Sequence, residues 1–272
     1  MRHTAEELKE ITYRNRKRFL ELFTNLGYGH LPSCFSWAEI ATVLYYEIMS
    51  LPDTASTQPS DRMVLSKGHG SGMLFPIFED LGYFTKEEME DTLRVGGETE
   101  KLRRLFTPGF DFYGGSLAIG LGMAAGLAKG DKLSGTPWKT YCLVGDAECY
   151  EGAIWEAAHF AGHQQLDNLT VILDRNGLGC SDFTEHMLAL EPLAQKWRDS
   201  GWDVYEIDGY DYAAIYQALY GASHEAHNKP QCIIAATKKG QGLDYVIDKP
   251  LMHGFMPKGA EEIERAFHEL KR

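Results

Sequence analysis

The stretch KTYCLVGDAECYEGAIWEAAHFAGHQQLDNLTVILDRNG, residues 139–177, alternates between two patterns. Apolar runs at 139–146 and 168–174 predict two buried strands, and the small-residue segment between them, 151–165, predicts a helix. The same order returns as a strand at 202–208, a helix at 211–226 and a strand at 231–238. Strand–helix–strand units of this length predict an α/β fold, in which a parallel sheet is flanked by helices on both faces.

The chain before this region predicts mainly helices. Residues 4–26 have apolar residues at helical intervals, and Thr4 and Glu7 have the spacing of a capping box at the helix start. We expect the basic run at 14–18 in this helix to lie on a solvated face. A second helix is expected over 36–49.

Glycine-rich segments follow these helices. Residues 61–70 predict a short strand that runs into a glycine-rich turn, and in the helix expected from residue 115 the glycines at 120, 122 and 126 would allow close backbone packing. We find no internal repeat and no linker. We therefore expect residues 1–272 to form a single domain with an N-terminal helical segment at about 1–50.

Composition excludes several classes of protein. A net charge of -12 argues against nucleic-acid binding, because neutralising phosphates requires a basic face. No apolar run reaches the ~18 residues that a membrane-spanning helix needs. The five cysteines are odd in number and form no C-x-x-C pair, and the N-terminus has no apolar leader. These features predict a cytoplasmic protein with reduced thiols.

Two polar residues follow neighbouring strands of the predicted sheet. Asp146 comes directly after the first strand, and Asn176 comes after the second. One carboxylate, one amide oxygen and one loop carbonyl would hold Mg²⁺, or another hard divalent cation such as Ca²⁺ or Mn²⁺, against a diphosphate. The simpler alternative is that Asp146 caps the helix and that Asn176 and Gly177 form an ordinary turn. The order strand, Gly-Asp, helix, strand, Asp-Arg-Asn-Gly favours the cation and diphosphate.

The segment that includes Asp146 and Asn176 resembles the thiamine-diphosphate motif, in which G-D-G is followed about 30 residues later by Asn. The surrounding residues are similar to those of the transketolase family, whose motifs follow in family order as GYGH (27–30), LSKGHG (65–70), GGSLAIG (114–120), KKGQG (238–242) and LMHG (251–254). The length matches the N-terminal half of a transketolase. The chain therefore resembles the diphosphate-binding subunit of a split transketolase, with the diphosphate-domain fold.

The resemblance implies roles for individual residues. Mg²⁺ would be bound by Asp146, Asn176 and the carbonyl of Leu178. Further implied cofactor contacts are the backbone at Gly145, Ala147 and Glu148, the residues Gly115, Ser116 and Leu117 near the aminopyrimidine, and Glu151 in the support of the subunit contact. Among the histidines, His30 and His69 would face the reacting carbon and the substrate oxygens, and His69 and His253 would reach the diphosphate end.

The resemblance also implies what the chain lacks. The family glutamate that activates thiamine diphosphate lies in the pyrimidine-binding domain, and 272 residues leave no room for that second domain. The partner would be a C-terminal transketolase subunit, with pyrimidine-binding and C-terminal domains, that supplies this glutamate. We expect an α2β2 assembly that transfers a two-carbon ketol or acyl unit to an aldehyde or carbonyl acceptor, and a chain that is inactive alone.

Departures from the family pattern leave the substrate open. Ala147 replaces a glycine, Ala118 and Ile119 replace a small and a polar residue, and Phe110 stands where the family has a histidine that binds a donor hydroxyl. We therefore expect an altered donor site at Phe110. The donor would be a ketose, phosphorylated or otherwise modified, or a 2-oxoacid such as pyruvate. The alternatives are the thiamine subunit of a 2-oxoacid decarboxylase or dehydrogenase, and a non-catalytic paralogue that acts as a binding partner.

Overall fold

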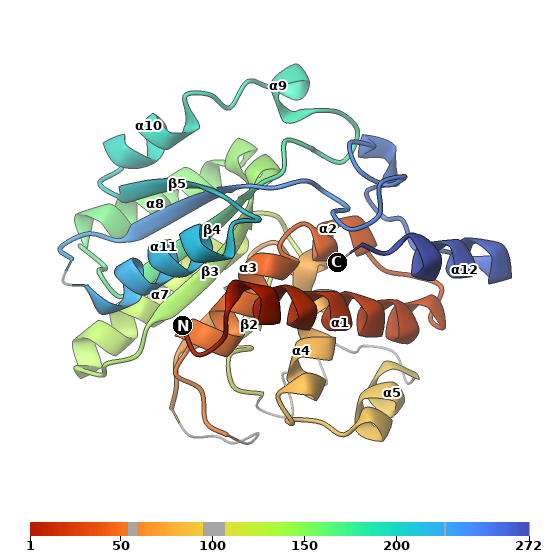
Figure 1. The fold of residues 1–272 in the computed structure, drawn as a ribbon. Coiled ribbons are helices and arrows are strands. Elements are labelled where there is room, and N and C mark those ends of the chain that lie inside the picture. Colours follow the sequence, from red (N-terminus) through yellow and green to blue (C-terminus); the bar gives the residue numbers. More distant parts are fainter. Residues whose placement is uncertain (54–58, 95–106, 226, 272) are drawn as a thin grey trace.

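Six strands form one parallel sheet in the computed structural model, which describes residues 1–53, 59–94, 107–225 and 227–271. The strand order is β2-β1-β3-β4-β6-β5, and every neighbouring pair is parallel (Figure 1). The strands are β1 Arg62–Leu65, β2 Phe112–Tyr113, β3 Thr140–Gly145, β4 Leu169–Arg175, β5 Asp203–Asp208 and β6 Gln231–Ala236. The predicted parallel sheet is confirmed.

Helices cover both faces of this sheet. Successive strand residues point to opposite sides, so each face packs against its own set of helices. Leu143 and Ile172, which are register partners, enter a core with α1, α3 and α11. Cys142 and Val171, one residue earlier, enter a second core with α7, α8 and α10. The helices are α1 Ala5–Thr24, α2 Leu31–Phe35, α3 Ala38–Val43, α4 Leu74–Asp80, α5 Lys86–Arg94, α7 Ile119–Ser134, α8 Gly152–His163, α9 Thr184–Met187, α10 Leu193–Asp199, α11 Tyr212–His224 and α12 Gly259–Glu269.

The N-terminal helix starts as the sequence predicts. The Thr4 hydroxyl accepts the Glu7 N–H, and the Glu7 carboxylate accepts the Thr4 N–H, which together form a capping box. The expectation of a solvated basic face is wrong for Arg16, whose side chain is 3% exposed and pairs with Glu39 at 2.7 Å. Arg16 is therefore part of the packing between α1 and α3, whereas Arg14 and Lys17 of the same run are exposed as expected.

The second predicted helix is longer and less regular than expected. Pro32 lies in the first turn of α2, where its missing N–H costs no hydrogen bond. After α3, a turn of π-helix over Leu44–Ile48 ends the segment. None of the helices within the described ranges is both long and apolar enough to cross a membrane.

Close packing of the glycine-rich helix α7 rests on one glycine. A Cβ atom on Gly120 would lie 2.4 Å from the Cα of Ser66, so the helix can approach β1 only without a side chain there. At Gly122 and Gly126 the added Cβ would meet no atom within 4 Å among the described residues. The predicted role in packing is confirmed for Gly120 and wrong for the other two.

Candidate active site

The predicted cation site lies where β3 and β4 end side by side. Gly145 of β3 is the register partner of Asp174 of β4, so Asp146 and Asn176 leave the same edge of the sheet. The Gly177 N–H donates to Oδ2 of Asp146 at 2.6 Å. Asp146 is 1% exposed, and burial, with the nearby Asp174 carboxylate, raises its pKa to about 6. The structure brings the two predicted polar residues together.

The side-chain amide of Asn176 is held in a defined orientation. Its Nδ2 donates to Oδ2 of Asp174 at 3.2 Å, and its Oδ1 accepts the Leu178 N–H at 3.1 Å. Asp174 is itself fixed by Lys67, Thr237 and Ser36. Burial raises the pKa of Asp174, but the Lys67 ammonium and the hydrogen bonds outweigh burial and bring the pKa below its ordinary value. The amide oxygen is thus oriented by a buried network.

Lys239 is a buried cation beside this site. It follows β6, is 4% exposed, and places Nζ 3.5 Å from the Leu178 carbonyl, 3.3 Å from the Gly179 carbonyl and 2.9 Å from Nδ1 of His253. Burial, with Lys67, lowers its pKa to about 8. No carboxylate among the described residues forms an ion pair with it. A buried charge without a counterion is costly, so this position fits a bound anion.

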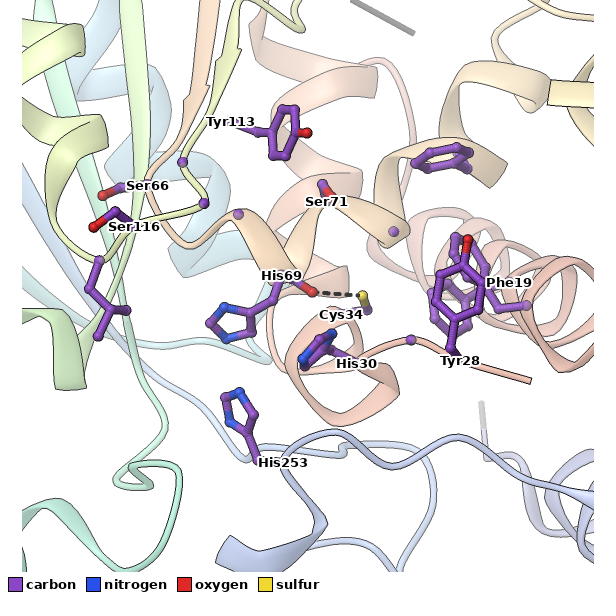
Figure 2. A pocket seen from close by; sticks show the side chains of 18 residues that line it. Phe19, Tyr28, His30, Cys34, Ser66, His69, Ser71, Tyr113, Ser116 and His253 are labelled. Atoms are coloured by element: carbon purple, nitrogen blue, oxygen red, sulfur yellow. Dashed lines mark hydrogen bonds between the residues drawn. The ribbon is translucent and has the colours of Figure 1, made fainter. Parts of the chain in front are cut away.

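Three histidines from distant segments meet in one cavity (Figure 2). The ring centroids are 5.3 Å apart for His30 and His69, 5.3 Å for His30 and His253, and 4.8 Å for His69 and His253. Burial lowers the pKa of His69 to about 2 and that of His253 to about 4, with nearby cations adding to the shift, and it also lowers the pKa of His30. The three imidazoles are therefore neutral near pH 7, and each can donate one hydrogen bond and accept another.

The cavity has a volume of about 450 Å³ and two unlike walls. Near the histidines it is lined by Ser66, Tyr113, Gly115, Ser116 and Leu117, and at the other end by Phe19, Phe23, Tyr28 and Phe75. The predicted segment from Gly115 to Leu117 is exposed at this wall. Lys239 contacts both His253 in the cavity and the Leu178 carbonyl after β4. It therefore connects the cavity to the edge of the sheet that carries Asp146 and Asn176.

Glu148 corrects one expectation about the site. Its buried carboxylate accepts hydrogen bonds from Ser66 Oγ at 2.7 Å, from the Ala118 N–H at 2.8 Å and from the Gly145 N–H at 2.8 Å. The side chain therefore joins β1, the start of α7 and the end of β3. The Gly145 N–H is already used in this way and is not offered to a diphosphate.

The residues that follow Asp146 form a short 3₁₀ turn, Asp146–Tyr150, before α8. The Ala147 N–H donates to Oδ1 of Asp146 at 2.8 Å, and because Ala147 does not have a positive φ, its methyl group fits this turn. Glu151 is exposed at the start of α8 and lies outside the buried network. Its place at the surface is compatible with a contact between subunits.

The expectation for Phe110 is wrong. Its side chain is 3% exposed, packs edge-on against Phe78 with ring centroids 6.1 Å apart, and stacks against Tyr113 with ring centroids 6.2 Å apart. Phe110 belongs to the core and does not line the cavity, whereas Tyr113 does. The sequence match placed Phe110 by its Thr-Pro-Gly neighbours, but these residues form the turn that leads into β2.

Sequence reasoning assigned no individual role to Lys239 or Lys67. Both lysines stand in glycine-containing segments that follow a strand, in KKGQG after β6 and in LSKGHG after β1. The carboxyl ends of parallel strands are where ligands bind in such sheets. Their position after a strand could therefore have indicated a ligand-binding role for both lysines. In the structure both ammonium groups lie at the site.

Comparisons with known proteins give a family for this chain. The family model described as "Transketolase, thiamine diphosphate binding domain" matches residues 12–270. The chain is 33% identical to an apulose-4-phosphate transketolase subunit of Phocaeicola vulgatus, over 98% of this chain and 94% of that protein. It is 35% identical to a 6-deoxy-6-sulfo-D-fructose transketolase subunit of Clostridium sp., over 98% and 94%. It spans only 41% of human transketolase, at 34% identity.

Solved structures give the same result for the fold. The chain superposes on the transketolase of Campylobacter jejuni with a TM-score of 0.83 and 27% identity, covering 98% of this chain and 43% of that one. For the transketolase of Leishmania mexicana the TM-score is 0.82 at 26% identity. The predicted fold is confirmed. The chain belongs to the transketolase family, and residues 12–270 correspond to its thiamine diphosphate-binding domain.

Proposed function

We propose that this chain is the diphosphate- and Mg²⁺-binding subunit of a two-subunit transketolase that depends on thiamine diphosphate. The observation that carries the proposal is the row of groups from Asp146 and Asn176 through Lys239 to the three histidines. One end offers hard oxygen ligands and a buried cation without a carboxylate partner among the described residues, and the other offers neutral imidazoles in a cavity.

The residues of this row fit the cofactor. Asp146, the Asn176 amide oxygen and the Leu178 carbonyl would hold Mg²⁺, and Lys239 would neutralise the diphosphate. When bound, thiamine diphosphate supplies the carbon nucleophile that carries the transferred unit. Gly115, Ser116 and Leu117 would face the aminopyrimidine. His30 and His69 would donate hydrogen bonds to substrate oxygens as neutral imidazoles, and His253 would contact the diphosphate end through its place beside Lys239.

The partner that we propose is a C-terminal transketolase subunit that supplies the activating glutamate, in an α2β2 assembly. Two relatives of nearly the same length are each named as one subunit of a transketolase, and the chain spans about 40% of the single-chain transketolases. An apolar surface next to the cavity supports a subunit contact there. Leu117, Ile119, Met123 and Phe160, from α7, α8 and the turn before α7, are each 45–49% exposed, and Glu151 is the exposed N-cap residue of α8.

For the donor we propose a ketose. Relatives at 33–35% identity are named for apulose 4-phosphate and 6-deoxy-6-sulfo-D-fructose, which both carry an anionic group. The case for a 2-oxoacid rested on the missing hydroxyl-binding histidine at Phe110, and the buried Phe110 side chain adds nothing in its favour. A screen of anionic ketoses and of pyruvate with the assembled enzyme, followed by mass spectrometry, decides between them.

The experiment that tests the function compares the chain alone with the chain purified together with its partner. We expect turnover of a ketose donor, with thiamine diphosphate and Mg²⁺, only in the complex, because the activating glutamate belongs to the partner. Fast turnover by the isolated chain would contradict the split site. A complex that binds the cofactor without any turnover would favour the non-catalytic alternative. We place the complex in the cytoplasm, in keeping with the free cysteines.

A further inference from the structure

Arg175, the last residue of β4, connects four side chains around the predicted cation site. Its Nη1 donates to Oδ2 of Asp146 at 3.2 Å and to Oγ1 of Thr184 at 2.7 Å. Its Nη2 donates to Oε1 of Glu185 at 2.7 Å and to Oε1 of Glu191 at 3.1 Å. The arginine side chain is 15% exposed, and its contacts with Asp146 and Thr184 are partly buried, whereas the Glu185 and Glu191 carboxylates are 41% and 58% exposed.

Three of these four partners lie in the connection that follows Arg175, a loop that includes the short helix α9. That loop folds back on itself: the Thr184 N–H donates to the Gly177 carbonyl at 2.9 Å, and Leu178 pairs with Phe183 as an isolated β-bridge. The Glu185 carboxylate also accepts the Leu190 N–H at 3.2 Å. The folded loop therefore fixes the segment that contains Asn176 and Leu178.

The cation site thus has two halves on different connections. Asp146 lies after β3, whereas Asn176 and Leu178 lie after β4. We propose that Arg175 is a positioning residue that holds the two halves in register for the divalent cation. This inference rests on the proposed function. The planar guanidinium suits the task because it presents donors in fixed directions to several acceptors, which an ammonium group cannot do.

A different role for Arg175 leads to the opposite expectation. If the guanidinium acted only through its positive charge, it would oppose the cation, and its removal would strengthen Mg²⁺ binding. Lysine at this position would then behave like arginine. The contacts favour positioning, because only one of the four partners is the carboxylate that would share the metal.

The test compares two variants. Arg175→Lys keeps the positive charge but loses the planar guanidinium with its fixed donors, and Arg198→Lys is the control. Arg198 forms an exposed pair with Glu206 at 3.2 Å. Calorimetry on the assembled complex gives the Mg²⁺ dependence of thiamine diphosphate binding. Amide hydrogen exchange on the ligand-free full chain reports the loop at 177–190. We expect Arg175→Lys to weaken Mg²⁺ binding by about tenfold or more and to speed exchange in the loop, and Arg198→Lys to do neither.

Three results would overturn the proposal. One is an Mg²⁺ affinity of Arg175→Lys within about twofold of wild type, because losing a residue that orients a metal ligand usually weakens the affinity about tenfold or more. Another is unchanged loop exchange in that variant. A third is tighter Mg²⁺ binding by Arg175→Gln. If Arg175→Lys does not fold, the double variant Glu185→Gln with Glu191→Gln is used, which keeps Arg175 and loosens the loop. If wild type binds no cofactor, the proposed function fails, and the exchange result still decides whether Arg175 holds the loop.

Discussion

At the scale of single residues, His253 links the site to the pH dependence of stability. Its folded pKa of about 4 lies below the ordinary histidine value of about 6.5, because burial disfavours the imidazolium and Lys239 repels it. Between these two pH values the unfolded chain binds a proton at this residue and the folded chain does not. The contribution of His253 to the free energy of unfolding is therefore full above pH ~6.5 and decreases as the pH falls towards ~4.

His253→Gln should remove this part of the pH dependence. We expect the free energy of unfolding of the variant to fall less than that of wild type between pH ~6.5 and ~4, measured by denaturant titration at a series of pH values. His186→Gln, at a side chain that is 68% exposed, is the matched control. The same pH dependence in wild type and His253→Gln would contradict the burial of a neutral His253.

The residues of the site differ in how far the sequence could predict them. Asp146 and Asn176 could be placed together because each follows a strand, and parallel strands end at the same edge. Phe110 could not be placed, because a three-residue match says nothing about which side of a turn faces a cavity. Arg175 was equally hidden, since three of its four partners depend on how the loop folds back, and no short-range pattern encodes that.

At the scale of elements, the buried strands were the most predictable. β3, β4 and β6 are largely apolar and almost fully buried, which is typical of a parallel sheet covered on both faces. β2 has two residues, too few for a pattern, and it exists through its pairing with β1. The start of α2 was missed because a helix that begins with Leu31-Pro32 looks like a loop in the sequence.

Helix α7 offers a test of packing with two glycines two residues apart. Gly120→Ala should lower the free energy of unfolding by about 1–3 kcal/mol, because the new methyl group meets the backbone of Ser66. Gly122→Ala should raise it by about 0.4–1 kcal/mol, because alanine favours the helix and meets no described atom. Denaturant unfolding of the isolated full chain measures both. Equal effects at the two positions would contradict the close approach of α7 and β1.

At the scale of the whole molecule, charge is distributed unevenly. The chain carries a net charge of -12, yet Lys67 and Lys239 are both buried at one edge of the sheet. The overall charge argues against nucleic acid as the partner, while the local cations provide for a small anionic group. The exposed apolar residues near the same edge form a surface that suits a second subunit.

The most direct test of the central claim is calorimetric titration of thiamine diphosphate, with Mg²⁺ present, into the complex of this chain with its partner. We predict binding by wild type and by the control Asp244→Asn, whose side chain is 63% exposed. We predict no detectable binding by Asp146→Asn, which keeps the shape of the side chain and loses the carboxylate that would hold the cation. Wild-type affinity in Asp146→Asn, or no binding by the wild-type complex, would contradict the claim.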